Sequence, residues 1–481
     1  MQIGIRRPAN LFGHPTDQTV QFINSDLQFD DKYKNAAATK IAFGHFPLSF
    51  TASTPKGETY QIVFANNSFS TYICGHLHAK ISSKLWWLHE LTIDGNEEKK
   101  LLRSFWEWEL GDWKENRFAR ILSIDKGAVS FTDFRLSNYK SGFDTRVVIT
   151  YPTDSRSMNL AETGGALIRN DINALIFSSQ GVLNVTARVF DSSREFRIVE
   201  EIPLLPKSGH NLYQYQYPLF HAKWNAETYK SDNPTRYWVQ VFVRDSDGRE
   251  ISSEERPFSV EGRGVIQSFH LLKYLLLGVR WEDLYSFLLW SNLGFLILLL
   301  TLPKVMHHFV QRSVTCQNWY HPFISYLIEG SRNRLIWFSM VTYLFWLIYM
   351  PWLWGYAMSE NGEITPMYLS GWRIKDGNNI LKYGGIGKVD LMVITLPFLY
   401  CVVTPMVLLI HGLFAQQGRV CASNWARKTL LAASGLVCLV HFKMCSNLML
   451  AYGFGPVAMS LALPWAPPLL FIVSIYNTMI L

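Results

Sequence analysis

The chain has 481 residues, a formal net charge of +7 and a hydrophobic fraction of 49%. A chain of this length is expected to form two or three folded units. The basic excess is modest and contains no dense basic run interleaved with aromatic residues, which argues against a nucleic-acid-binding protein. Five of the six cysteines lie at or beyond Cys316, so no disulfide framework is predicted.

Two short apolar runs near the start each lead into a loop that contains histidine. Ile41-Ala42-Phe43 precedes Gly44-His45, and Tyr72-Ile73-Cys74 precedes Gly75-His76-Leu77-His78. Such runs predict buried strands, and in α/β sheets ligands bind in the crevice outside the strands' carboxyl ends. His76 and His78 share one face of an extended backbone, so each can serve one of two neighbouring metal ions.

Glycine before each histidine is expected to let the backbone turn sharply and approach an ion closely. Neutral imidazole suits zinc, iron and manganese. A third pair, Gly13-His14, precedes Pro15 and is interpreted as a turn, because a single glycine–histidine pair is common.

Gly44-His45-Phe46-Pro47 and Gly75-His76-Leu77-His78 resemble the last two metal-ligand motifs of the calcineurin-like metallophosphoesterases. Residues 10–17, 45–50 and 105–113 resemble, more narrowly, the plant membrane metallophosphoesterases related to transmembrane protein 62. This resemblance implies that His45 and His76 ligate one divalent metal ion and His78 a second one. The two ions, iron, zinc or manganese, would clamp the attacking and leaving oxygens of an in-line displacement at phosphorus.

The resemblance also identifies motifs that do not occur before His45. Members of the family begin with Asp-x-His, Gly-Asp-x-x-Asp and Gly-Asn-His, which supply the carboxylate, asparagine and leaving-group histidine of the site. We therefore expect an incomplete catalytic domain, assign no catalytic residue and leave open whether this chain is an enzyme. Gly111-Asp112-Trp113-Lys114-Glu115 is interpreted as a packing and turn element rather than a substitute carboxylate motif.

Three domains are expected along the chain. Residues 1–140 are predicted to form a partial α/β metallophosphoesterase domain of the four-layer β-sandwich type. Residues 141–262 are predicted to form an immunoglobulin-like β-sandwich, because 184–190 and 237–243 alternate like half-buried strands. The second run leads into a turn at 245–248, and its Trp238 is expected in the core. Residues 263–481 are predicted to form an α-helical transmembrane domain.

The apolar tail contains five candidate transmembrane spans. The fourth carries His441 and Lys443, and Lys443 is interpreted as a snorkelling anchor rather than a proton relay, with the same caution for His411 and His441. Prolines 464, 467 and 468 are expected to break or kink the fifth span. The five expected spans are 284–302, 335–357, 391–414, 429–451 and 456–480.

Loop charges predict the orientation of a multi-pass membrane protein. The connections after the first and third spans are basic, which places them in the cytoplasm and the polar front part in a lumen or outside the cell. The expected location is the endomembrane system or the plasma membrane. Asn184-Val185-Thr186 and Asn66-Asn67-Ser68 are acceptor triplets for N-glycosylation, consistent with this orientation. Residues 1–7 contain no secretory signal, which again favours a missing upstream segment.

The sequence leaves two classes of function open, and a transporter is a third, weakly supported alternative. The first is a membrane-anchored, metal-dependent phosphoesterase of the calcineurin-like family, inactive or incomplete as this chain. The second is a non-catalytic membrane protein whose lumenal head binds a partner. The expected partners are the lipid bilayer and a phosphate ester of unknown identity, and no nucleic acid.

Overall fold

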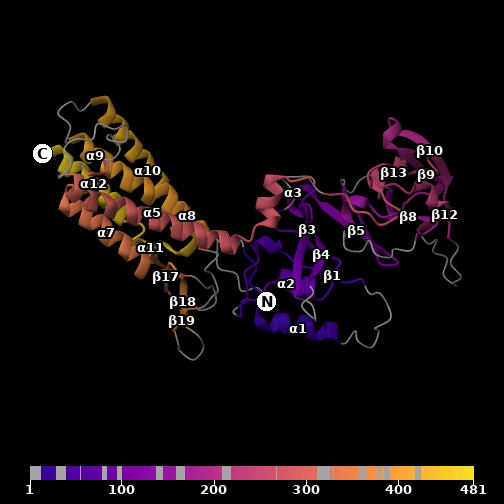
Figure 1. Ribbon diagram of the computed structural model, residues 1–481, viewed down its shortest axis with the longest axis horizontal. Coiled ribbons are helices and arrows are strands. Elements are labelled where there is room, and N and C mark those ends of the chain that lie inside the picture. The colour runs from indigo at the N-terminus through magenta and orange to yellow at the C-terminus, as the bar shows by residue number, and fades with distance from the viewer. Residues whose placement is uncertain are drawn as a thin grey trace. The chain divides into compact units, whose positions relative to one another are not determined.

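The computed structural model describes residues 12–28, 39–54, 56–77, 84–94, 100–136, 145–158, 168–207, 218–266, 268–310, 326–328, 330–356, 364–375, 381–383, 391–417 and 424–480. The chain divides into two compact units (Figure 1). One unit comprises Pro15–Arg280, which we call the head. The other comprises Trp281–Leu481 with Met1–His14, and its segment from Trp281 onward is called the tail.

A four-stranded mixed sheet forms the first part of the head. Its strand order is β1-β2-β4-β3, with β1 parallel to β2, β2 parallel to β4, and β3 antiparallel to β4. The expected strands at 41–43 and 72–74 are confirmed as β1 and β2, and Ala42 pairs with Tyr72. The strands are β1 Ile41–Phe43, β2 Thr71–Cys74, β3 Trp86–Asp94 and β4 Lys100–Glu109.

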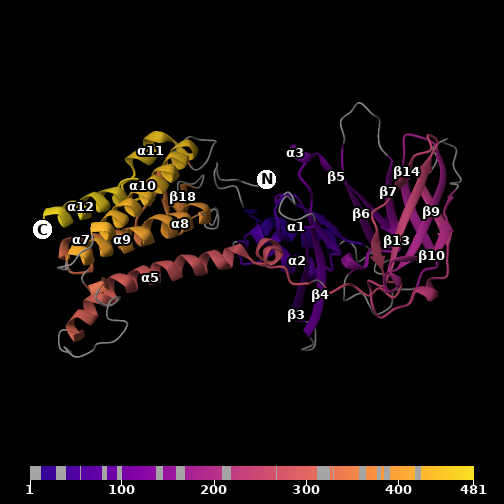
Figure 2. The ribbon, with the colours of Figure 1, turned by 90° about the horizontal axis from the view of Figure 1, so that it is seen from above.

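The two faces of this sheet are covered by different elements because side chains alternate along each strand. Helices α1 (Asp17–Gln28) and α2 (Tyr60–Asn66) contribute Val20, Val63 and Phe64 to the core that also contains Tyr72, Cys74 and Phe105. Strands β5 (Phe118–Asp125) and β6 (Ala128–Arg135) cover the other face, where Ile73, Trp106 and Trp108 are buried with Val129. Figure 2 shows these elements from a second direction.

Two antiparallel sheets form the second part of the head, as expected for the immunoglobulin-like β-sandwich. One has the order β10-β9-β13-β14, with β15 also paired to β13, and the other has the order β11-β12-β8-β7. Val185, Ala187, Val189, Val239 and Val241 fill the core between them. The strands are β7 Arg146–Tyr151, β8 Asp171–Phe177, β9 Val182–Asp191, β10 Arg197–Pro203, β11 Leu205–Pro206, β12 Leu219–Lys223, β13 Tyr237–Asp245, β14 Glu250–Ser252 and β15 Arg256–Phe258.

The predicted strands at 184–190 and 237–243 are confirmed as parts of β9 and β13, and Gly248 adopts a positive φ of 78° in the turn that follows. The expectation that Trp238 lies in the core is wrong. Tyr237 is buried, whereas the Trp238 ring is half-buried on the opposite face of β13, against Phe196 and the Arg156 guanidinium. Alternation therefore predicted the strand but not which of its faces is buried.

Three helices in the described part of the tail are long and apolar enough to cross a membrane. They are Trp281–Val305, Met392–Gln416 and Trp425–Tyr452, and they match three of the five expected spans. The first lies within α5 (Trp281–Val310), drawn as the long coral helix in Figure 2, and the third within α10 (Asn424–Tyr452). The second runs continuously through α8 (Met392–Phe398), a π-helical turn η9 (Leu399–Val403) and α9 (Thr404–Gln417).

The other two expected spans are not single long helices. The helix expected over 335–357 ends at Tyr349 as α7 (Arg334–Tyr349), because Pro351 disfavours helical geometry at Met350. The helix expected over 456–480 is divided into α11 (Phe454–Met459) and α12 (Ala466–Ile480). The expected break near Pro464 is therefore confirmed. α7 and the Ala466–Met479 part of α12 are shorter apolar helices.

Side chains satisfy backbone groups at the break between α11 and α12. The Tyr343 hydroxyl donates to the Ala462 carbonyl at 3.0 Å, and His441 Nε2 lies 2.8 Å from the Leu463 carbonyl oxygen. Such partners are required because unsatisfied backbone groups are costly in an apolar environment. His441 thus has a structural role in the tail. His411 is likewise buried, and its Nδ1 lies 2.8 Å from the Val407 carbonyl oxygen in its own helix.

A small antiparallel sheet follows α7 where no strands were predicted. Its order is β16-β17-β18-β19, and Trp352, Leu353, Met367 and Trp372 are fully buried there. The strands are β16 Leu353–Gly355, β17 Thr365–Tyr368, β18 Gly371–Lys375 and β19 Leu381–Tyr383. The connection after α7 is therefore partly a folded element of the tail, rather than only a polar loop.

Candidate metal site

The loops that carry His45 and His76 lie side by side at the ends of β1 and β2. Because these strands are parallel neighbours, their carboxyl ends meet at one edge of the sheet. Two backbone hydrogen bonds join the loops, from Gly44 N–H to the Ile73 carbonyl at 3.0 Å and from Gly75 N–H to the His45 carbonyl at 3.1 Å. The structure therefore places these two histidines together, whereas His78 lies outside the described residues.

The two imidazole rings are in direct contact. His76 Nδ1 lies 3.2 Å from His45 Nε2, and the ring centroids are 5.1 Å apart at an interplanar angle of 82°. A hydrogen bond between two ring nitrogens requires that one of them accept, so at least one imidazole is neutral. Neutral imidazole is also the form that binds metal ions.

The separation of these nitrogens fits two ligands of one ion. Zinc–nitrogen bonds of about 2.0–2.1 Å at a tetrahedral angle place two ligand atoms roughly 3.3 Å apart. The observed 3.2 Å between His45 Nε2 and His76 Nδ1 is close to that value. Within the described residues, however, no group of three or more His, Cys, Asp or Glu side chains is arranged to hold a metal ion. Among the described residues, His45 and His76 can thus supply two of the ligands that a metal site requires.

Two buried carboxylates on β4 accept hydrogen bonds from the backbone of the two histidine loops. Glu107 and Glu109 are 0% and 2% exposed and lie on the same face of the strand. Leu48 N–H, three residues after His45, donates to Glu107 Oε1 at 2.9 Å. Leu77 N–H, directly after His76, donates to Glu109 Oε1. One strand therefore positions both loops.

His89 and Cys74 complete this buried polar cluster. His89 Nε2 lies 2.6 Å from Glu107 Oε2, and the Cys74 thiol donates to Glu109 Oε2 at 2.8 Å. Burial raises the pKa of the Cys74 thiol well above its usual value, and the charges of Glu107 and Glu109 raise this pKa further. The thiol is therefore protonated at neutral pH and serves as a hydrogen-bond donor.

Sequence reasoning assigned no role to Glu107, Glu109 or His89. One signal was available, since two acidic residues alternate with tryptophans at 106–109 in a run otherwise typical of a buried strand. A buried carboxylate requires donors, and here the histidine loops supply them.

The turn predicted at residues 111–115 is confirmed, whereas Trp113 is 61% exposed and does not pack in the core. Asp112 is 2% exposed, and its Oδ1 accepts from Lys114 N–H at 2.9 Å at the start of α3 (Trp113–Asn116). Its backbone carbonyl accepts from Phe118 N–H at 3.1 Å. Asp112 therefore stabilises the turn between β4 and β5.

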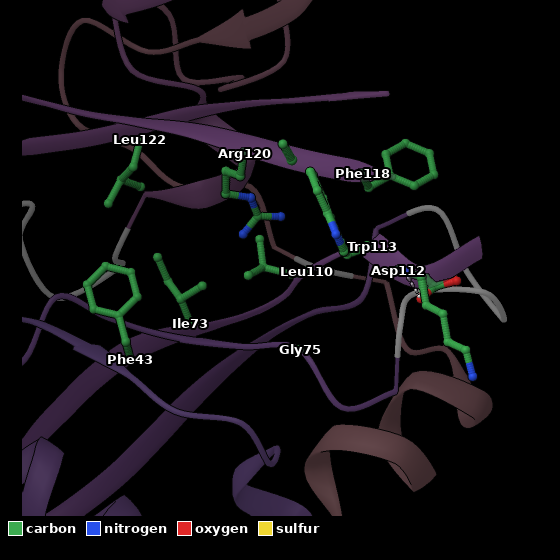
Figure 3. Close-up of a pocket in the computed structure, with 12 residues that line it drawn as sticks. Phe43, Ile73, Gly75, Leu110, Asp112, Trp113, Phe118, Arg120 and Leu122 are labelled. Carbon is green, nitrogen blue, oxygen red and sulfur yellow. Dashed lines mark hydrogen bonds between the residues drawn. The ribbon is translucent and has the colours of Figure 1, made fainter. Parts of the chain in front are cut away.

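An apolar pocket of about 430 Å³ lies beside the histidine loops. Figure 3 shows Phe43, Ile73, Leu110 and Leu122 around it, and Gly75 at its edge belongs to the loop of His76. Arg120 also lines the pocket, but Asp133 binds its guanidinium at 2.6 and 2.8 Å. Neither His45 nor His76 lines the pocket, so it adjoins the candidate metal site without containing it.

Comparison with known proteins agrees with this architecture. A profile described as the TMEM62 Ig-like domain matches residues 141–264, and one described as the TMEM62 C-terminal domain matches residues 286–424 and 418–462. A protein of Arabidopsis thaliana named "putative metallophosphoesterase" is 32% identical over 87% of this chain and 61% of its own length. Mouse transmembrane protein 62 is 28% identical over 51% of this chain and 32% of its own length.

These findings first define a class of protein. It is a membrane protein whose β-rich head contains an immunoglobulin-like domain and whose tail consists of apolar helices. Within that class, the chain is similar to the metallophosphoesterases related to transmembrane protein 62. The match covers 61% of the plant relative and 32% of the mouse relative. No solved structure shows significant similarity to the chain.

Proposed function

We propose that this chain is a membrane-anchored, metal-dependent phosphoesterase of the calcineurin-like family. His45 and His76 contribute ligands to one divalent ion, His78 is a ligand of the second, and the reaction is hydrolysis of a phosphate ester. The contact between His45 Nε2 and His76 Nδ1 at 3.2 Å carries this proposal, because two nitrogens at that distance suit one ion. The name of the plant relative supports the same reaction class.

The residues of the head have distinct tasks in this proposal. Bound divalent ions would supply Lewis acidity toward the phosphate ester and an activated water. Glu107 and Glu109 position the two loops by accepting hydrogen bonds from Leu48 and Leu77. Because both carboxylates are buried behind the loops, they act on the histidine positions rather than on the substrate.

Metal uptake by the intact chain tests the ligand assignment. The detergent-solubilised protein is dialysed against zinc or manganese, and bound metal is measured by plasma mass spectrometry. His45→Ala and His76→Ala are each expected to weaken metal binding by more than the about 10–100-fold typical of losing an outer-shell partner. Hydrolysis of p-nitrophenyl phosphate and bis-p-nitrophenyl phosphate is measured on the same samples.

His14→Ala is the matched control, because His14 also follows a glycine but belongs to the interpreted turn. Its metal content is expected to equal that of the unmodified chain. Metal binding that is unaffected by both His45→Ala and His76→Ala would contradict the proposed ligands.

A second candidate function is a non-catalytic head that binds a partner at the membrane. It is supported by the immunoglobulin-like part of the head, a folded unit that carries neither of the two contacting histidines. Bound metal without turnover of either phosphate ester would favour this function. Metal-dependent turnover that is lost in the His45 and His76 variants would favour the phosphoesterase.

A further inference from the structure

Four apolar side chains are exposed in the segment that leads from the last strand of the head to the first candidate membrane span. Ile266, Phe269, Leu271 and Leu272 are 85%, 71%, 61% and 47% exposed. The last two belong to the short helix α4 (Leu271–Lys273), and the π-helical turn η8 (Tyr274–Gly278) follows. Clusters of exposed apolar side chains mark interaction sites more often than isolated ones do.

The head holds residues 274–280, which directly follow the exposed side chains. Leu277 is fully buried, and the Tyr274 ring lies 5.9 Å from that of Trp87 on β3. The Ser49 hydroxyl donates to the Leu276 carbonyl at 2.5 Å, and the Arg280 guanidinium donates to the Ser53 hydroxyl at 2.9 Å. The exposed side chains are therefore presented by an ordered support and not by a loose linker.

Chain continuity determines which partner can reach these side chains. Helix α5 begins at Trp281, and its first 25 residues form a candidate membrane span. The nine residue steps from Leu272 to Trp281 cover at most roughly 30 Å at about 3.3–3.6 Å per residue. Leu272 therefore lies within roughly 30 Å of the start of α5, which brings it and its apolar neighbours within reach of the surface of a bilayer that α5 crosses.

The chemistry of the segment suits a lipid surface. Phenylalanine and leucine are typical of helices that lie in the membrane interface, and tyrosine is enriched at that depth. Lys273 lies among the apolar residues, and a lysine near a membrane can extend its ammonium group to the headgroup level while its methylene groups contact apolar surface. The exposed apolar residues Ile198 and Val199 on β10 lack this continuity with a span.

We propose that Ile266 and residues 268–274 form an interfacial segment, in which Ile266, Phe269, Leu271 and Leu272 insert into the headgroup region of the bilayer. The residues that follow this segment are bonded to the head, because Ser49 donates to the Leu276 carbonyl and Arg280 donates to Ser53. Membrane contact and the candidate metal site thus share one structural support. The inference does not depend on metal binding or on phosphoesterase activity.

Photo-crosslinking of the intact chain in lipid nanodiscs tests the proposal. A diazirine amino acid replaces Leu272 in the full chain, which is reconstituted in phosphatidylcholine with phosphatidylserine. The matched control places the same amino acid at Ile198, whose exposure of 44% is close to the 47% of Leu272. After illumination, mass spectrometry is expected to find lipid adducts at position 272 and only background at position 198.

Equal lipid adducts at both positions, or adducts of position 272 with a second copy of the chain in place of lipid, would overturn the proposal. A second measurement uses the double variant Leu271→Ser and Leu272→Ser. In nanodiscs, amide exchange over residues 268–274 is expected to become faster than in the unmodified chain, while exchange in β9 and β13 stays the same. Unchanged exchange over residues 268–274 would also overturn it.

Discussion

Gly44 and Gly75 precede the two loop histidines, but the space around the two glycines differs. Neither has a positive φ, so the need for glycine does not come from the backbone conformation that was expected. A Cβ added at Gly44 would lie 2.1 Å from the Tyr72 hydroxyl oxygen, whereas one at Gly75 would be 3.7 Å from its nearest neighbour, Leu110. Packing therefore requires glycine at position 44 but leaves room for a larger residue at position 75.

Gly44→Ala is therefore expected to destabilise the loop of His45. The added methyl group would displace the Tyr72 ring, whose hydroxyl donates to the Phe46 carbonyl at 2.6 Å. Overpacking of this kind costs about 1–3 kcal/mol, which lowers the unfolding temperature by about 2–4 °C per kcal/mol in a unit of this size. The measurement is thermal unfolding of the solubilised chain, followed by tryptophan fluorescence.

Gly75→Ala is the control for this change, because the same methyl group meets only ordinary van der Waals contacts. Its unfolding temperature is expected to match that of the unmodified chain. An equal decrease in both variants would show that packing against Tyr72 is not the reason for glycine at position 44.

At the scale of one element, strand β4 combines an apolar face with a polar one. Trp106 and Trp108 are buried toward β5 and β6, whereas Glu107 and Glu109 face the helices and the histidine loops. Register explains this division, because Tyr72 pairs with Glu107 and Cys74 with Glu109. A slip of one residue would exchange the two faces, so the buried carboxylates and tryptophans together define the register.

Glu107→Leu is expected to lower the stability of this sheet by about 2–5 kcal/mol, because it leaves Leu48 N–H and His89 Nε2 without their acceptor in a buried site. Glu107→Gln retains one carbonyl acceptor and is expected to lower the stability of the sheet less than Glu107→Leu does. The measurement is amide hydrogen exchange of β2 and β4 in the intact chain, which reports local opening free energies.

The control is Glu90→Leu, which changes an exposed glutamate on the neighbouring strand β3. Surface substitutions of this kind usually change the free energy of unfolding by no more than about 0.5 kcal/mol. If exchange in β2 and β4 responded equally to the changes at 107 and 90, Glu107 would not stabilise the two loops.

At the scale of the whole molecule, the orientation of the chain in the membrane decides where the candidate metal site acts. The basic connections of the tail predict a head on the lumenal or extracellular side. Asn66 and Asn184, the two glycosylation acceptors of the head, are both exposed. Their exposure makes glycosylation a direct test of orientation, because glycan transfer occurs only on the lumenal side.

Thr186→Ala is expected to remove one N-glycan from the chain expressed in eukaryotic cells, because it destroys the acceptor triplet at Asn184. Thr186→Ser preserves the triplet and should keep the glycan. The measurement is electrophoretic mobility before and after endoglycosidase treatment of the full chain. A head that carries no glycan and is digested by protease added from the cytoplasmic side would contradict the predicted orientation.

Local patterns in the sequence were sufficient to predict several strands and helices. Alternation over 184–190 and 237–243 predicted β9 and β13, and apolar length predicted the three long helices of the tail. The apolar runs before His45 and His76 predicted two strands that the structure shows as parallel neighbours. These features depend on side-chain periodicity and composition, which the sequence states directly.

Other features depend on residues far apart in the chain, and only the tertiary structure decided them. Glu107 accepts a hydrogen bond from Leu48, 59 positions earlier in the chain, and His441 satisfies the carbonyl of Leu463 across a helix break. Trp238 faces outward because the partner sheet packs on the side of Tyr237. Burial and hydrogen-bond partners follow from which surfaces meet in space, and periodicity along one segment does not contain that information.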